Sequence, residues 1–95
     1  MATREENRRN AYHYIVAKME KHVGLPPNFS NKWLANKLVL SDNDRFSIEV
    51  DLNRLEKGKS APSLKLVEAF KSLLGPVIGE DEINSHLVAP FLTDL

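Results

Sequence analysis

The segment Leu52–Gly75, LNRLEKGKSAPSLKLVEAFKSLLG, has two leucine-rich stretches of helical spacing on either side of a glycine and a proline. Gly58 is suited to end a helix, because glycine adopts the left-handed backbone conformation without a steric cost. Pro62-Ser63 is typical of a helix start, with the serine as N-cap. The segment therefore predicts one helix over about 47–57 and a second that begins at Ser63 and ends at Gly75-Pro76.

A long helix is predicted at the start of the chain. Thr3 and Glu6 form a T-x-x-E capping box, in which each side chain can pair with a free amide of the first turn. Apolar residues then recur at helical spacing as far as Gly24, a natural C-terminal cap. These signals predict a helix over 4–23.

A shorter helix follows an interruption at LPPN (25–28), where two prolines remove backbone donors. Ser30 is the expected N-cap, and Phe29 and Leu34 stand at the positions of a hydrophobic staple. The pattern predicts a helix over 31–39. Trp33 falls on its apolar side, so we expect it to belong to the core.

The C-terminal region, 76–95, contains a cluster of three acids at 80–82, where the start of a helix favours negative charge. Apolar residues after this cluster predict a short fifth helix that ends before Pro90 and leaves an apolar tail, FLTDL. We therefore expect an all-α fold, a bundle of about five short helices in a single domain over 1–95.

The segment before Leu52 supports two interpretations. Phe46, Ile48 and Val50 alternate with polar residues, as in a half-buried strand, and RFSIEV could then pair with KLVLS as a β-hairpin around the turn SDNDR. Ile48 and Leu52 also stand four positions apart, as in a helix. Length and context favour the helix, with the extra residues forming an enlarged turn at 40–47.

Composition excludes several classes of protein. The apolar fraction of 42% is typical of globular domains, and the absence of cysteine removes disulfides and thiolate sites. The three histidines have no metal-ligand spacing, and no phosphate-binding loop or nucleophile motif is present. We therefore expect no enzyme, no metal and no cofactor. The N-terminus lacks a signal peptide and no apolar run could span a membrane, so we expect a cytoplasmic protein without a membrane partner.

The formal net charge is zero, but the charges are unevenly distributed. Residues 1–75 contain all thirteen Lys and Arg against nine acids, and residues 76–95 contain four acids and no base. A basic body with an acidic C-terminal extension is compatible with DNA binding, for which a basic surface is the usual requirement.

The segment around Gly58 resembles the lambda-repressor-like, or Xre-type, helix-turn-helix family. In that pattern a recognition helix ends in hydrophobic-Glu-x-Gly, and a short loop leads to Pro-Ser and a leucine-bearing helix. The positions that match are Leu55, Glu56, Gly58, Pro62, Ser63 and Leu66, with Leu74-Gly75 at the end of the next helix and, upstream, Leu34-Ala35 and Leu38. The resemblance covers about 30–75. It implies a helix-turn-helix core there. The interval from Leu38 to Glu56 is longer than in the family pattern, so the extra residues near SDNDRFS form a longer turn, an extended recognition helix or a small hairpin.

The resemblance implies a sequence-specific DNA-binding transcriptional regulator of phage or bacterial type, a repressor or antitoxin-like protein that acts as a homodimer on double-stranded DNA. The region 76–95 would supply the dimer surface. Asn31 stands where the family commonly has a glutamine that contacts DNA. The expected DNA-binding residues are Asn31, Lys32, Arg45, Ser47, Asn53, Arg54, Lys57 and Lys59.

Two other functions remain open at the level of sequence. Glu49 and Asp51 lie on the predicted recognition helix, where carboxylates would oppose a polyanion. This favours a protein-interaction adaptor or inhibitor, in which an acidic helix faces a basic protein partner on the same scaffold. A purely structural oligomerising domain would instead assemble without either ligand.

Overall fold

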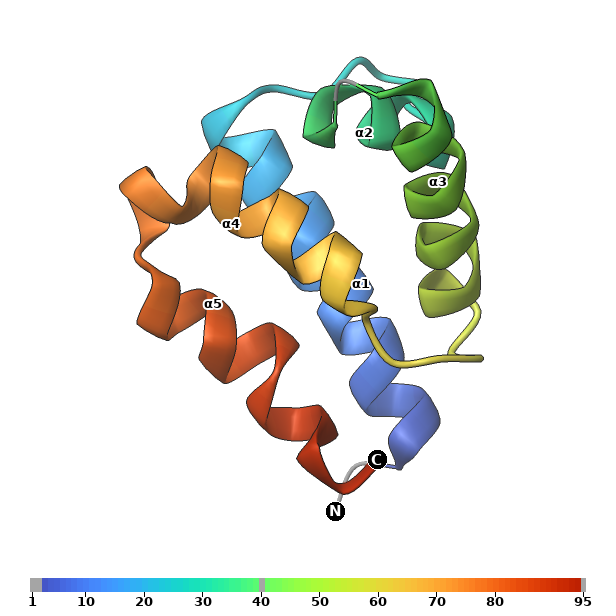
Figure 1. Cartoon of the computed structure of the whole chain (residues 1–95), viewed down its shortest axis with the longest axis vertical. Helices are drawn as coiled ribbons and strands as arrows, with labels where there is room; N and C mark the ends of the chain where they lie inside the picture. The colour runs from blue at the N-terminus through green and yellow to red at the C-terminus, as the bar shows by residue number, and fades with distance from the viewer. Residues whose placement is uncertain (1–2, 40, 95) are drawn as a thin grey trace.

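A computed structural model describes residues 3–39 and 41–94 and contains helices alone among them (Figure 1). The elements are α1 (Arg4–His22), α2 (Asn31–Leu38), α3 (Asp42–Glu56), α4 (Leu64–Ile78), α5 (Glu80–Leu87) and a 3-10 helix, η1 (Ala89–Asp94). The predicted all-α bundle is therefore confirmed. In Figure 1, α2 and α3 form one side of the molecule, α5 and η1 form the opposite side, and α1 and α4 lie between them.

One hydrophobic core joins these elements. It receives residues from every helix, including Phe91 of η1, and the described residues place no polar or charged side chain inside it. The largest side chains without solvent exposure are Phe70, Ile15, Met19, Leu34, Ile48, Leu52, Leu55, Leu66, Ile83 and Leu87. Trp33 packs against this core while partly exposed. A core that extends from α1 to η1 makes the described chain one packing unit.

The predicted helix starts are confirmed at three positions. The hydroxyl oxygens of Thr3, Ser30 and Ser63 each accept a hydrogen bond of 3.1 Å from the backbone amide three residues later. Each bond pairs one of the amides that the first turn of a helix leaves without a partner, and such a cap is typically worth about 1 kcal/mol. These short-range signals are why the starts of α1, α2 and α4 could be predicted from sequence.

The enlarged turn predicted at 40–47 is wrong, and so is the alternative hairpin. Helix α3 begins at Asp42, so most of SDNDR is its first turn and the strand-like residues after it are helical. Asp42 and Asp44 stand where the positive end of the helix dipole favours carboxylates. Arg45 also pairs with Asp42 across 2.8 Å, a contact between positions three apart on a helix. The extra residues therefore lengthen α3 at its N-terminal end, and the turn before it is short.

The expected stop at Gly75-Pro76 is also wrong, because α4 continues to Ile78 with Pro76 inside it. A proline this close to the C-terminal end removes a single backbone hydrogen bond of the last turn. The helix ends at Gly79 instead, which has φ +98° and donates its amide to the carbonyl of Gly75 across 2.8 Å. The three acids at 80–82 then form the first turn of α5, as predicted.

The expected apolar tail is instead the helix η1. Phe91 is buried, and Ile83 and Leu87 of α5 are buried with it in the core of the same chain. Most apolar side chains of the C-terminal region are therefore used within the chain, and Leu92 remains exposed.

The turn after α3 is closed by the predicted left-handed glycine. Gly58 has φ +72° and donates its amide to the Leu55 carbonyl, and the amide of Lys59 bonds to the Arg54 carbonyl. These two bonds form a Schellman motif, which pairs the last carbonyls of the helix. A guanidinium nitrogen of Arg8 donates to the Gly58 carbonyl across 3.2 Å, so the turn is also attached to α1.

Candidate nucleic-acid interface

Helices α2 and α3 are joined by a short connection that side chains hold in place. Arg45 donates from Nε to the Val39 carbonyl across 3.2 Å, and from Nη1 to Asp42 across 2.8 Å. One guanidinium thus binds the C-terminal end of α2 and the first turn of α3, and Leu40 between them lies outside the described residues. Helices α2 and α3 also pack closely along their lengths. The geometry is that of two helices joined by a tight turn, in which the orientation of the second is fixed.

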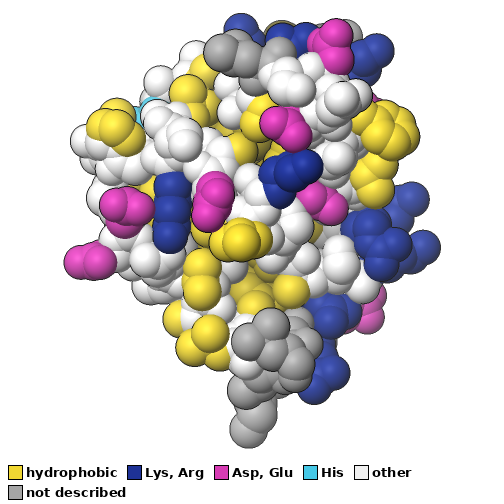
Figure 2. Space-filling view, viewed as in Figure 1, with side chains coloured by type: hydrophobic (Ala, Val, Ile, Leu, Met, Phe, Trp, Pro, Cys, Tyr) yellow, Lys and Arg dark blue, Asp and Glu magenta, His cyan; other side chains and the backbone are white. Residues whose placement is uncertain are grey.

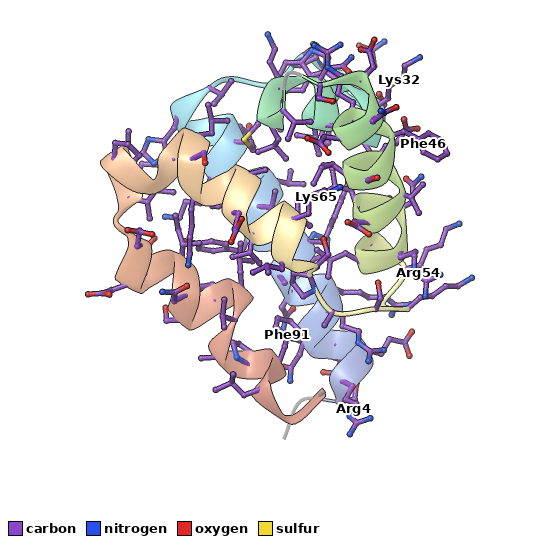
Figure 3. All side chains as sticks on the ribbon, in the orientation of Figure 1. Arg4, Lys32, Phe46, Arg54, Lys65 and Phe91 are labelled. Atoms are coloured by element: carbon purple, nitrogen blue, oxygen red, sulfur yellow. The ribbon has the colours of Figure 1, made fainter. Side chains whose placement is uncertain are left out.

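Helix α3 has one face in the core and an opposite face in solvent. Ile48, Leu52 and Leu55 are fully buried. We call the solvent-facing side the outward face of α3; the exposed residues along its middle are Asn43, Phe46, Val50, Asn53, Arg54 and the C-cap Lys57, and two exposed acids at its edge are Asp42 and Glu56. In Figure 3, Phe46 and Arg54 project from the same edge of the molecule, and Lys32 of α2 lies beside them. The outward face therefore combines amide, apolar and cationic groups.

Two acids of α3 point toward α4, to one side of the outward face. Asp51 accepts a hydrogen bond of 2.6 Å from the Ser63 hydroxyl, the same hydroxyl that caps α4. Asp44 pairs with Lys65 across 3.2 Å. The expectation that Asp51 faces a binding partner is therefore wrong. The position of Asp51 on the helix directs its carboxylate toward α4, where it binds the hydroxyl of the N-cap residue Ser63.

We expect Asp51→Ala to lower the free energy of unfolding by about 1–2 kcal/mol, because it removes a charge-assisted hydrogen bond that fixes the N-cap of α4. Urea unfolding followed by circular dichroism measures the change. Glu49→Ala removes the same charge from the same helix and should change stability by less than about 0.5 kcal/mol. Equal losses in the two variants would contradict the role of Asp51 in the cap.

The remaining acids of α3 lie on its other side, toward α2. Asp42, although exposed, is paired with Arg45, and Glu56 accepts a hydrogen bond of 3.0 Å from the Asn31 amide. Glu49 borders a hollow of about 380 Å³ between α2 and α3. The other residues around this hollow are Lys32, Asn36, Asp42, Arg45 and Phe46. Two of the five acids of α3, Asp44 and Asp51, therefore turn to α4, while Asp42 and Glu56 are exposed at the edge of the outward face and paired within the chain.

A chain of hydrogen bonds connects the outward face to α1. The hydroxyl of Tyr12 donates to Asn31 Oδ1 across 2.6 Å, and Asn31 Nδ2 donates to Asn53 Oδ1 across 2.7 Å as well as to Glu56. Burial, together with the Glu56 carboxylate, raises the pKa of Tyr12 to about 12, so its hydroxyl stays a donor at neutral pH. The Asn53 amide is thereby oriented: its oxygen faces Asn31 and its NH₂ group remains a donor to solvent.

Cations gather where α3 ends. Arg54, Lys57 and Lys59 are exposed around the Gly58 turn. Figure 2 shows Lys and Arg side chains along the edge that α3 forms in Figure 1, below an exposed hydrophobic group. Cations at a helix C-terminus also interact favourably with the helix dipole, so part of this arrangement stabilises α3 itself.

The structure brings most of the predicted site residues to one surface. Asn53, Arg54, Lys57 and Lys59 cluster at the end of α3, and Lys32 is exposed on α2. Asn31 and Arg45 are engaged within the chain by the hydrogen bonds above, and Ser47 is half-buried beside the outward face.

Sequence analysis missed other residues of this surface, namely Asn43, Phe46, Val50, Tyr12 and the bridging role of Glu56. Once α3 is known to be helical from Asp42, spacing alone places Phe46 and Val50 opposite its buried face. The contacts of Tyr12 and Glu56 with Asn31 have no local signal, because they join residues far apart in the chain.

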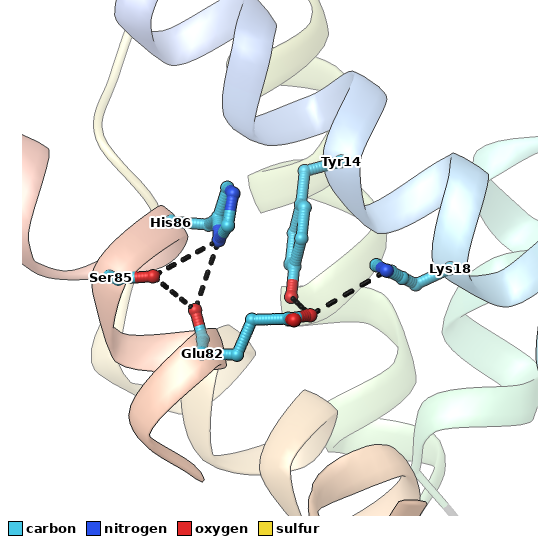
Figure 4. Close-up of polar contacts among 5 residues, drawn as sticks. All are labelled: Tyr14, Lys18, Glu82, Ser85 and His86. Carbon is cyan, nitrogen blue, oxygen red and sulfur yellow. Dashed lines mark hydrogen bonds and ion pairs between the residues drawn. The ribbon is translucent and has the colours of Figure 1, made fainter. Parts of the chain in front are cut away.

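A second polar cluster joins α1 to α5 on the other side of the molecule (Figure 4). The Tyr14 hydroxyl donates to Glu82 Oε2 across 2.9 Å, and Lys18 Nζ lies 3.5 Å from the same oxygen. The rings of Tyr14 and His86 stack with their centroids 4.1 Å apart. The hydrogen bond from Tyr14, with a smaller effect of Lys18, lowers the pKa of Glu82. Burial, together with the Glu82 carboxylate, raises the pKa of Tyr14.

In Tyr14→Phe, we expect the pKa of Glu82 to rise toward the ordinary glutamate value of about 4.3, because the donor that favours the carboxylate is gone. A carboxyl group whose pKa is lowered by folding stabilises the fold above its unfolded pKa, and this contribution is lost as the pH falls through the folded pKa. Stability should therefore depend less on pH in the acid range in the variant than in wild type. Carboxyl ¹³C NMR titration measures the pKa, and Ser85→Ala, which leaves both carboxylate contacts in place, should not change it.

Within residues 3–39 and 41–94, no group of three or more His, Asp or Glu is arranged to hold a metal ion. In the same ranges, no helix combines the length and the apolar character needed to cross a membrane. Comparison of the chain with protein-family models, curated proteins and solved structures finds no match. The outward face of α3 is therefore the feature on which a function can be argued.

Proposed function

We propose that this protein binds double-stranded DNA through α3 as a sequence-specific transcriptional regulator, a repressor or antitoxin-like protein. The observation that supports the proposal is the composition of the outward face of α3. The middle of this face consists of amides, apolar groups and cations, and four of the five acids of the helix have partners within the chain, namely Asp42, Asp44, Asp51 and Glu56. Because Asp44 and Asp51 turn to α4 and Asp42 is paired with Arg45, the helix opposes a polyanion less than its sequence suggests.

The dimensions of α3 suit a major groove. Its 15 residues correspond to a length of about 22 Å, and a groove about 12 Å wide admits one helix. Asn53, with its donor group directed outward, can contact base edges, and Arg54, Lys57 and Lys59 can contact phosphates. In Figure 1, α5 lies on the opposite side of the molecule from α3, so the acids at 80–82 are directed away from the proposed DNA.

A homodimer is the expected assembly for two recognition helices on a two-fold symmetric DNA site. Exposed apolar residues support this part of the proposal. Leu64 and Leu92 border a hollow of about 410 Å³ between the start of α4 and the α5–η1 segment. Sedimentation velocity with and without DNA measures the assembly, and a strictly monomeric complex would contradict it.

The proposal is tested by fluorescence anisotropy with duplexes that contain a randomised core, followed by selection of the duplexes that bind. We expect enrichment of a defined sequence and a steep loss of affinity between 50 and 200 mM salt, with a log–log slope of about −0.9 for each phosphate contacted. No enrichment together with no salt-dependent binding would overturn the proposal.

A protein-interaction adaptor is the second candidate, favoured by one observation. Phe46, with 70% of its surface exposed, borders the hollow between α2 and α3, as an aromatic anchor of a protein interface would. Glu49→Lys distinguishes the two functions. The added cation should strengthen non-specific DNA binding, whereas an adaptor that uses this surface against a basic partner would lose affinity.

A further inference from the structure

Two apolar side chains occupy the middle of the outward face of α3. Phe46 is 70% exposed and Val50 is 39% exposed. They stand four positions apart and therefore lie on the same side of the helix, one turn from each other. Within the described residues, the pair is covered only in part, and Phe46 more weakly than Val50.

The core does not account for this pair, because Ile48, Leu52 and Leu55 fill the opposite side of α3 and are fully buried. A phenylalanine on a solvent-facing helix has no role in folding, and a valine lowers helix propensity slightly. The pair is therefore best explained by a partner that presents apolar groups to α3.

The charges around the pair define that partner. Arg54 and Lys57 follow Phe46 and Val50 on the same face, and Lys32 lies beside it (Figure 3). Asp42 and Glu49 border the hollow next to Phe46, but Arg45 borders it too and pairs with Asp42, so cations remain in excess around the pair. This arrangement complements a polyanion that has small apolar groups between its charges. In the major groove of DNA, the 5-methyl group of thymine is the apolar group that base edges present, and phenylalanine is among the side chains that contact it.

The spacing agrees with such contacts. Four residues advance about 6 Å along a helix, close to the rise of about 6.8 Å over two base-pair steps. We infer that Phe46 and Val50 pack against thymine 5-methyl groups two base pairs apart, and that the DNA site contains thymine at these positions. This inference rests on the proposed function and specifies what the outward face recognises.

Replacement of thymine by deoxyuridine tests the inference, because it removes the methyl group and keeps the Watson–Crick pairing. The probe is the duplex enriched from the randomised pool, synthesised with thymine or with deoxyuridine, and the readout is the ratio of the two dissociation constants. For wild type we expect deoxyuridine to weaken binding about fourfold for each methyl contacted, and so about 15-fold for two. In Phe46→Ala the ratio should fall by about fourfold, and in the double variant Phe46→Ala/Val50→Ala it should approach one.

Val23→Ala is the matched control, because Val23 is 40% exposed at the C-terminal end of α1 and lies outside both the outward face of α3 and the proposed dimer surface. It should keep the wild-type ratio. Circular dichroism should show that all three variants fold, since none of the substituted side chains belongs to the core. A ratio of one in wild type, with binding retained, would overturn the inference and leave the proposed function in place. The same ratio in wild type and in the double variant would also overturn it. Absence of any enriched duplex would overturn both.

Discussion

Gly58→Ala is expected to lower the free energy of unfolding by about 2–4 kcal/mol, and two independent causes contribute. Gly58 has φ +72°, where an L side chain costs about 1–2 kcal/mol. A Cβ at this position would also collide with the side chain of Glu5 and lie 3.1 Å from the Glu5 carbonyl oxygen. Because the second neighbour is backbone, the start of α1 would have to move, and such overpacking costs about 1–3 kcal/mol.

Two other glycines of the chain separate these causes. Gly24 and Gly79 also have positive φ, at +91° and +98°, but a Cβ at either would meet nothing within 4 Å. Gly24→Ala and Gly79→Ala should therefore show a backbone cost alone in urea unfolding monitored by circular dichroism. We expect about 1–2 kcal/mol for Gly24→Ala and about 1–3 kcal/mol for Gly79→Ala, because Gly79 has ψ 137° and lies outside the left-handed helical region. If all three variants lost the same stability, the contact between the Gly58 turn and α1 would not contribute to the fold.

The double variant Arg54→Ala/Lys57→Ala is expected to bind the enriched duplex about 30-fold more weakly at physiological salt. Each cation that contacts a phosphate releases counterions on binding, so the loss of two should make the log–log salt slope less steep by about 2. The variant should fold like wild type, because both side chains are exposed and outside the core. Anisotropy titrations between 50 and 200 mM salt measure affinity and slope together.

The control for this pair is Lys21→Ala/Lys71→Ala, which removes the same net charge from α1 and α4. If α3 contacts the DNA, this control should retain most of the affinity and nearly the wild-type slope. Equal effects of the two double variants would mean that affinity follows overall charge, and the assignment of the contact to α3 would be wrong.

The parts of the fold that could be predicted from sequence are those with local causes. Thr3, Ser30 and Ser63 are capping residues that act within one turn, and Gly58 ends α3 through its own backbone conformation. Such signals involve three or four neighbouring residues, so they are visible without knowledge of the tertiary structure.

The start of α3 could not be predicted because two patterns coincide there. Phe46, Ile48 and Val50 alternate like a strand, since two exposed apolar residues, Phe46 and Val50, interrupt the polar side of a helix. Packing resolves the ambiguity: Ile48 is buried in the core while Phe46 and Val50 are exposed, and a strand would place all three on one face. The end of α4 was predicted wrongly at Pro76, because the free-energy cost of a proline in a helix depends on how close it lies to the end of that helix.

The cations of the candidate site could be predicted from sequence, but their arrangement in space could not. The placement of Arg54, Lys57 and Lys59 near one helix end follows from the predicted end of that helix at Gly58. Whether Asp51 opposes or supports binding depends on where Ser63 lies, twelve positions away in the chain. Sequence places a charge on a helix, but only the neighbouring helix determines which side of the helix that charge occupies.

The division of α3 into two faces has a consequence for how such a protein can change. Residues that hold the fold, such as Ile48 and Leu52, and residues that meet the solvent, such as Phe46 and Arg54, do not overlap. Under the proposed function, specificity can therefore evolve, or be engineered, by exchange of the outward residues while the scaffold keeps its stability. Asn53 is the exception. It lies on the outward face, and its hydrogen bond with Asn31 also attaches α3 to α2.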